Sequence, residues 1–166
     1  VITDLIQEEL PEIPKSVWTD GKTLLVDKLL RAFQTFWKND SDSFPKQIKD
    51  FAAIRLDEAT HVFILMAFLQ RAINGGADIF RESSEGRGAV DIRLTYNNHS
   101  YLIEVKLATK INLTKAYDQV IRYLDSRGEK EGWLVIFDRD DPKSWDEKIY
   151  ERVQEINGYT IRVFGC

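Results

Sequence analysis

The chain has 166 residues, of which 43% are hydrophobic and 30% are charged, as in globular domains that bury a core without disulfides or metals. Its net charge of −4 argues against broad, non-specific nucleic-acid binding but leaves room for a local basic groove. The lone cysteine, Cys166, excludes an internal disulfide and suits the reducing cytoplasm, where we expect the protein. The longest apolar run, residues 62–69, is far too short to cross a bilayer.

The N-terminal part of the chain is predicted to be helical. Apolar residues recur at helical spacing and predict a helix over residues 22–38. The polar run 39–43, followed by Phe44-Pro45, predicts a loop, and we place a domain boundary at residue 50, giving segments 1–50 and 51–166. Because the chain begins with Val1 rather than methionine, we expect it to be the C-terminal piece of a longer protein.

A second, strongly apolar helix is predicted over residues 57–73, with a start that the sequence leaves open back to Gln47. Asp57 is suited to cap its N-terminus, and Asn74-Gly75-Gly76 is a typical stop signal. Because it is apolar nearly all round between residues 62 and 69, we expect it to be buried. Residues 77–83 are compatible with a strand that follows this helix, and residues 84–88 with a glycine-rich turn.

Residues 86–107 predict two strands joined by a tight turn at Asn97-Asn98. Side chains alternate faces along a strand, so Glu104 and Lys106 share a face, and Asp91 joins them if the strands pair. Two carboxylates beside an ammonium suit a divalent-metal site that activates water against a phosphodiester. The same pattern also fits the solvated face of an ordinary hairpin, where cross-strand ion pairs contribute about 0.2–1 kcal/mol each.

The C-terminal half alternates predicted helices and strands. A helix over residues 113–126 carries Gln119 and Tyr123 on one edge of its apolar stripe, and residues 132–137 predict a strand covered on both faces. A capping box at residues 144–147 predicts a helix that runs to Asn157-Gly158, and residues 159–164 predict a last strand. The whole order predicts an α/β fold of the α+β mixed-sheet kind, with helices on the sheet's faces.

A helix carrying Glu, a strand carrying Asp, a strand carrying Glu-x-Lys, and then a helix and a strand resemble the core of the PD-(D/E)XK nuclease superfamily. More closely, AFLQRAINGG, GRGAVDI, IEVKL, DQVIRYLD, GWLVIFDR and SWDEKIY look like the C-terminal domain of a family of predicted AAA-type ATPases, from about residue 56 to the end. The resemblance implies a restriction-endonuclease-like αβββαβ core, with residues 1–50 a helical connector. No GxxxxGK[ST] motif is present, so any ATPase lies outside this chain.

The resemblance also implies roles for individual residues. Asp91 and Glu104 would bind Mg²⁺ or Mn²⁺ together with the backbone carbonyl of Val105. Lys106 would orient the attacking water or stabilise the developing charge, unless it serves only as a salt bridge to Glu104 or Asp91. Glu58 fills an additional carboxylate position that binds metal or its water. Glu82 and Glu85 are alternatives for that position, and a favourable helix-dipole interaction is the plainer explanation of Glu58.

Two further residues are candidate nucleic-acid contacts. Arg87, between two glycines, would reach a phosphate backbone, and Gln119 would position DNA or hold Lys106. A solvated helix position is the plainer explanation of Gln119, and a solvated loop position is the alternative for Arg87. His61 and His99 belong to no metal-ligand pattern, so we do not expect zinc. Trp133 and Trp145 are predicted to pack in the core.

We therefore expect metal-dependent hydrolysis of nucleic acid, with DNA the first candidate, by a domain that is joined to an ATPase in the full-length chain. A homodimer is a plausible assembly, because cutting both strands of a duplex usually needs two active sites. The main alternative is a non-catalytic binding or regulatory module that keeps the three residues as an ion-pair network, an interpretation that the acidic pI favours. An interaction domain with no link to nucleic acid is the third possibility.

Overall fold

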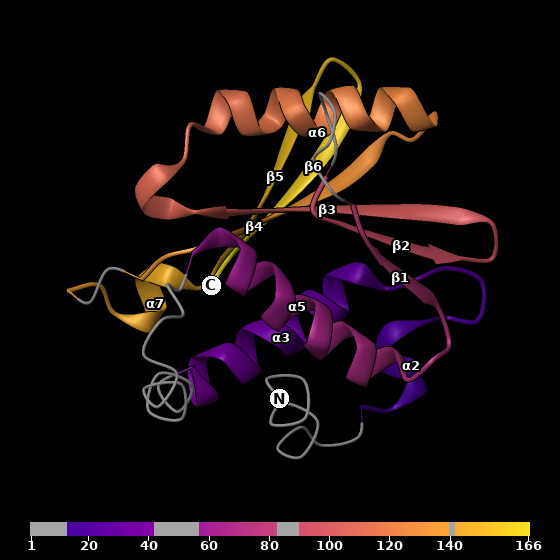
Figure 1. Cartoon of the computed structure of the whole chain (residues 1–166), viewed down its shortest axis with the longest axis horizontal. Coiled ribbons are helices and arrows are strands. Elements are labelled where there is room, and N and C mark those ends of the chain that lie inside the picture. The colour runs from indigo at the N-terminus through magenta and orange to yellow at the C-terminus, as the bar shows by residue number, and fades with distance from the viewer. Residues whose placement is uncertain (1–12, 42–56, 83–89, 140–141) are drawn as a thin grey trace.

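A single mixed sheet organises the described part of the chain (Figure 1). The structure is a computed structural model that describes residues 13–41, 57–82, 90–139 and 142–166. In these residues the sheet has the strand order β1-β2-β3-β4-β6-β5. Strands β1, β2 and β3 pair antiparallel, β3-β4 and β4-β6 pair parallel, and β5-β6 pair antiparallel. The strands are β1 (Asp78–Arg81), β2 (Ile92–Tyr96), β3 (His99–Leu107), β4 (Glu131–Phe137), β5 (Tyr150–Ile156) and β6 (Tyr159–Gly165).

Helices cover both faces of this sheet, which confirms the predicted mixed α/β architecture (Figure 1). Helices α3 and α5 lie against one face, and α6 lies against the other. The helical elements are α2 (Lys15–Trp18), α3 (Val26–Asp40), α5 (Glu58–Ile73), the 3₁₀ turn η1 (Ala108–Lys110), α6 (Leu113–Arg127) and α7 (Trp145–Lys148). None of the helices in the described ranges has the length and apolar character that crossing a bilayer requires.

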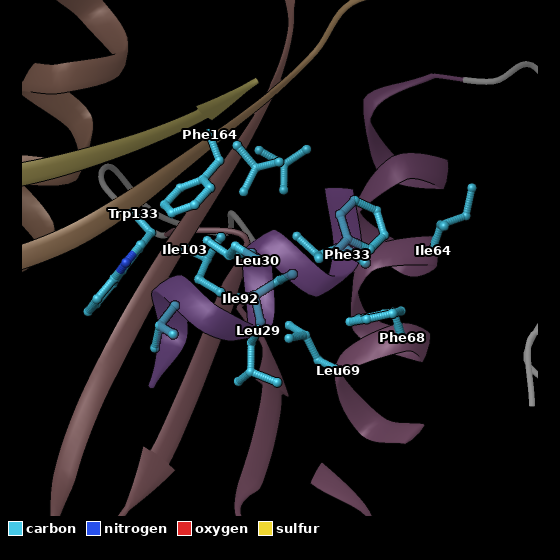
Figure 2. Close-up of a cluster of buried hydrophobic side chains, with 14 of the residues drawn as sticks. Leu29, Leu30, Phe33, Ile64, Phe68, Leu69, Ile92, Ile103, Trp133 and Phe164 are labelled. Atoms are coloured by element: carbon cyan, nitrogen blue, oxygen red, sulfur yellow. The ribbon is translucent and has the colours of Figure 1, made fainter. Parts of the chain in front are cut away.

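The period of two along the central strands divides the buried side chains into two cores. Ile103 and Trp133 face α3 and α5, whereas Leu102 and Leu134 face α6. Strand β4 is therefore covered on both faces, as its continuous apolar sequence predicts. Figure 2 shows the larger core, in which side chains of α3 and α5 meet the sheet: Leu29, Leu30, Phe33, Ile64, Phe68, Leu69, Ile92, Ile103, Trp133 and Phe164.

Helix α3 belongs to the same core as the sheet. The ring of Phe33 lies 5.3 Å from that of Phe68 in α5 and 5.8 Å from that of Phe137 in β4. Aromatic pairs at such distances contribute about 0.5–1.5 kcal/mol beyond their buried area. The predicted boundary at residue 50 itself falls in residues 42–56, outside the described part of the chain.

Helix α5 has the cap at Asp57 and the stop at Asn74 that the sequence predicts. The side chain of Asp57 accepts a hydrogen bond from the Thr60 amide, and Asn74 takes a left-handed conformation with φ of 48° at the C-terminus. Most of the helix is buried, as predicted, but Phe63 is 49% exposed.

The hairpin of β2 and β3 also has its predicted turn. Asn97 and Asn98 both have positive φ, 48° and 64°, as a two-residue turn of type I′ requires. Tyr96 pairs with His99 on either side of that turn, which fixes the register of the two strands.

Substitutions at Asn98 test this turn. Asn98→Ala should lower the free energy of unfolding by about 1 kcal/mol, because a left-handed conformation is costly for alanine and tolerated by asparagine and glycine. Asn98→Gly should remain close to the wild type in urea denaturation. Equal stability of the alanine and glycine variants would contradict the turn assignment.

The predicted helix from Trp145 to residue 156 is wrong beyond its first turn. The capping box at Ser144 is present, but α7 ends at Lys148, and the following residues form β5, paired with β6. Asn157 and Gly158, with φ of 51° and 81°, connect the two strands as a hairpin turn. Asn-Gly between two strand-forming runs is the strongest short-range hairpin signal, so here it marks a strand connection and not a helix stop. The last predicted strand is confirmed as β6.

Candidate active site

The site forms where β2 begins beside the middle of β3. Ile92 pairs with Ile103, and continuing this register by one residue would place Asp91 opposite Glu104. The Asp91 carboxylate accepts a hydrogen bond of 2.7 Å from the Val105 amide, which joins the two strands at this point. The predicted hairpin thus brings Asp91 next to the strand that carries Glu104 and Lys106.

The backbone departs from regular alternation at Asp91. Val90 is buried in the core under α6, whereas Ile92 is buried in the core under α3 and α5, although residues two apart in a regular strand share a face. Asp91 lies at this bend, just before β2 starts. The Val105 amide of β3 therefore donates to the side chain of Asp91, where a regular strand pair would offer it a backbone carbonyl.

Glu104 is completely buried on the face that α6 covers. Its neighbours in the parallel strand, Leu134 and Ile136, pair with Glu104 and Lys106 and belong to the apolar core there. Burial, and secondly the negative charge of Asp91, raise the pKa of Glu104 to about 7. Apart from an ion pair with Lys106, neither oxygen of this carboxylate has a hydrogen-bond partner in the described residues.

Lys106 lies between two carboxylates. Its Nζ is 2.7 Å from Oε1 of Glu104 and 3.4 Å from Oε1 of Glu58. Burial alone would lower the pKa of Lys106, but attraction to Glu104, Glu58 and Asp91 outweighs it and raises that pKa. Lys106 is therefore an ammonium ion, and its side chain keeps 21% of its surface exposed. Of the salt bridges considered for Lys106, to Glu104 or to Asp91, the one to Glu104 is present, and Glu58 is an additional partner.

Of the three candidates for the additional carboxylate, the structure brings Glu58 to Lys106. Glu58 opens the first turn of α5, and its side chain is 40% exposed. The carboxylate of Glu82 instead binds Nε of Arg93 at 2.6 Å, which holds the pKa of Glu82 below its usual value. Glu85 lies outside the described residues.

The remaining predicted residues are less central. Gln119 is half-buried on α6, the helix that covers the face carrying Glu104, and Arg87 lies outside the described residues. His61 is buried against the ring of Phe137, and His99 is exposed at the start of β3. Trp133 packs in the core, and Trp145 is partly buried against it, as predicted. The structure adds one residue that the sequence patterns do not single out. Arg81 pairs with Ile92, next to Asp91, although more than twenty residues of sequence separate it from Glu104.

The donor atoms fit a hard divalent cation. Asp91 and Glu104 supply carboxylate oxygens, and the two buried Glu104 oxygens have unused acceptor capacity. The N–H and C=O of a strand residue point to the same side, so the Val105 carbonyl lies on the side of Asp91. Two carboxylates suffice for Mg²⁺, which keeps several waters. Among the described residues no cluster of three or more His, Cys, Asp or Glu side chains is arranged around a common metal position.

Comparison with known proteins identifies a family for most of the chain. Residues 24–141 match the model of a protein family described as a domain of unknown function, DUF8371. The matched range runs from α3 to the end of β4 and includes Glu58, Asp91, Glu104 and Lys106. No curated protein matches the chain.

Proposed function

The chain belongs to the DUF8371 family, a domain of unknown function, so its function has to be argued from the site itself. We propose that the domain hydrolyses phosphodiester bonds of nucleic acid in a metal-dependent reaction. The observation that carries this proposal is a fully buried carboxylate, Glu104, held between Asp91 and the ammonium of Lys106. Burying such a charge is costly, so sites of this kind concentrate at functional positions.

Asp91 and Glu104, with the carbonyl of Val105, would hold Mg²⁺ or Mn²⁺. When bound, the cation would supply charge neutralisation and a water molecule of lowered pKa. The carboxylate of Asp91 is oriented by the Val105 amide, and Glu104 lies on the central strand β3, which supports both as ligands.

Lys106 would act on the reacting phosphate. Its ammonium is partly exposed beside the buried carboxylates and can donate hydrogen bonds to an attacking water or to the phosphoryl oxygens as negative charge develops. Glu58, more exposed and 3.4 Å away, orients that ammonium and offers a second acceptor toward solvent. Gln119 and Arg87 remain proposed contacts to the substrate. An ATPase joined to this domain and a homodimer also remain proposals.

Metal binding is the first test. Isothermal calorimetry should detect one Mn²⁺ site in the wild type, and Asp91→Ala should weaken it at least about tenfold by removing a ligand. Asp146→Ala is the matched control, because Asp146 is an exposed aspartate on α7 that should leave binding unchanged. Absence of any Mn²⁺ site in the wild type would overturn the proposal.

The second candidate is a non-catalytic module of an ATPase. It is favoured by one observation, that Lys106 already pairs with Glu104 and Glu58, so the group forms a closed ion-pair network. In that case a Glu104→Gln, Lys106→Met double variant would leave the function of the linked ATPase unchanged, and the wild type would bind no Mn²⁺.

A further inference from the structure

Two exposed aromatic rings lie at one edge of the described sheet, Phe80 on the edge strand β1 and Phe63 on helix α5. The exposed large hydrophobic residues of the described chain are Phe63, Phe80 and Val153, and the first two lie at this edge, with 49% and 41% of their surface exposed. An arginine stacks on each of these rings. Cζ of Arg81 lies 4.3 Å from the ring centre of Phe63, and Cζ of Arg93 lies 4.4 Å from that of Phe80.

The two pairs lie on opposite faces of β1, and the Phe80 pair is on the face that carries Glu104. Phe80 pairs with Arg93 and Arg93 with Leu102, so Phe80 lies on the same sheet face as Leu102 and Glu104. Glu104 lies two strands away from Phe80 and two residues further along the strand direction. With strands about 4.8 Å apart and a rise of about 3.3 Å per residue, the two residues are separated by roughly 12 Å. Phe63, on α5, lies beyond the other face of β1, in contact with Arg81.

Aromatic rings with arginines suit one class of ligand. Nucleic-acid bases stack on aromatic faces and on guanidinium planes, and arginine also binds phosphates. Stacking of this kind requires unpaired bases, because in a duplex each base is already stacked within the helix. Arg81 supplies positive charge for such a strand on a chain whose net charge is −4, whereas Arg93 is paired with Glu82 and offers its guanidinium plane for stacking.

We propose that Phe63, Phe80, Arg81 and Arg93 form a stacking platform for unpaired nucleotides, and that it guides a single strand to the site at Glu104. Binding to the platform is independent of chemistry, whereas guiding the strand to cleavage rests on the proposed hydrolysis. The substrate class that follows is single-stranded nucleic acid, or a single-stranded segment that adjoins a duplex.

Fluorescence anisotropy with a labelled thymidine oligonucleotide, in EDTA, tests the platform on the 166-residue chain. Phe63→Ala and Phe80→Ala should each raise the Kd about tenfold, the loss expected for one stacked base, and Phe→Trp at either position should preserve binding. Val153→Ala, an exposed residue on the opposite edge strand β5, is the matched control and should leave the Kd unchanged. Because each ring is about half buried and contacts an arginine, the alanine variants should lose a little thermal stability but remain folded at the assay temperature, which thermal unfolding checks.

Failure of the platform and failure of the proposed function give different results. If the wild type binds no Mn²⁺ but the phenylalanine variants still weaken oligonucleotide binding, the platform stands without the hydrolysis. The platform is wrong if the wild type does not bind the oligonucleotide. It is also wrong if the Phe63→Ala, Phe80→Ala double variant binds the oligonucleotide as tightly as Val153→Ala does. Neither result depends on metal binding. Equal weakening of duplex binding would also overturn the assignment to unpaired strands.

Discussion

Replacing Lys106 with methionine should lower the rate of nucleic-acid cleavage by roughly a hundred- to a thousandfold, the loss typical of removing one donor that stabilises transition-state charge. Methionine keeps an unbranched chain of similar length but cannot donate a hydrogen bond or carry charge. In the structure the Lys106 ammonium contacts both Glu104 and Glu58, so it is the donor that can stabilise negative charge at the site. Single-turnover cleavage in Mn²⁺ measures the effect on chemistry apart from substrate binding.

Lys110→Met serves as the control, because Lys110 is an exposed lysine on the 3₁₀ turn that follows β3. Calorimetry on both variants should still show Mn²⁺ binding, since the proposed ligands are untouched. A Lys106→Met variant that cleaves at the wild-type rate would remove Lys106 from the mechanism and favour the non-catalytic module.

Glu104→Gln should stabilise the metal-free protein at pH 8, by an amount on the order of 1–3 kcal/mol. Burial and the charge of Asp91 raise the pKa of Glu104 to about 7, against an ordinary value of 4.5. The folded protein therefore binds this proton more tightly than the unfolded chain. The resulting stability is fully present below about pH 4.5 and is lost as the pH rises through 7, because a charged carboxylate must then stay buried.

Urea denaturation in EDTA at pH 5 and pH 8 measures this effect. The advantage of the glutamine variant over the wild type should be large at pH 8 and much smaller at pH 5. Glu129→Gln, outside the site, should show no such change. Adding Mn²⁺ should stabilise the wild type and not Glu104→Gln, because the ion binds only the folded state with its ligand intact. A variant that is less stable than the wild type at pH 8 would contradict the raised pKa.

Much of the fold follows from local signals. The caps of α5, the Asn97-Asn98 turn and the apolar strand β4 are specified by residues within a few positions of one another, so the sequence predicts them well. The segment after Lys148 is misread because a true capping box opens only one turn, and Asn157-Gly158 ends helices and connects strands alike.

The site is only partly predictable for a different reason. Alternation along β3 places Glu104 and Lys106 on one face, but it does not reveal that α6 covers that face and buries Glu104 completely. Nor does it decide between Glu58 and Glu82, because the contact of Glu58 with Lys106 joins residues 48 positions apart and depends on how α5 packs against the sheet. Helix packing, which is set by the whole core, determines both features.

The hydrogen bond from the Val105 amide to Asp91 should let this amide exchange with deuterium at a rate set by the site and not by the sheet. Neighbouring amides of a central strand are held by the sheet and exchange with deuterium only when the sheet opens, whereas the partner of this one is a side chain. Val105 should therefore exchange whenever Asp91 swings away, without unfolding of the sheet. Its exchange rate, measured by NMR with and without Mn²⁺, would report how often the site opens, and a rate equal to that of its neighbours would show that Asp91 moves only with the sheet.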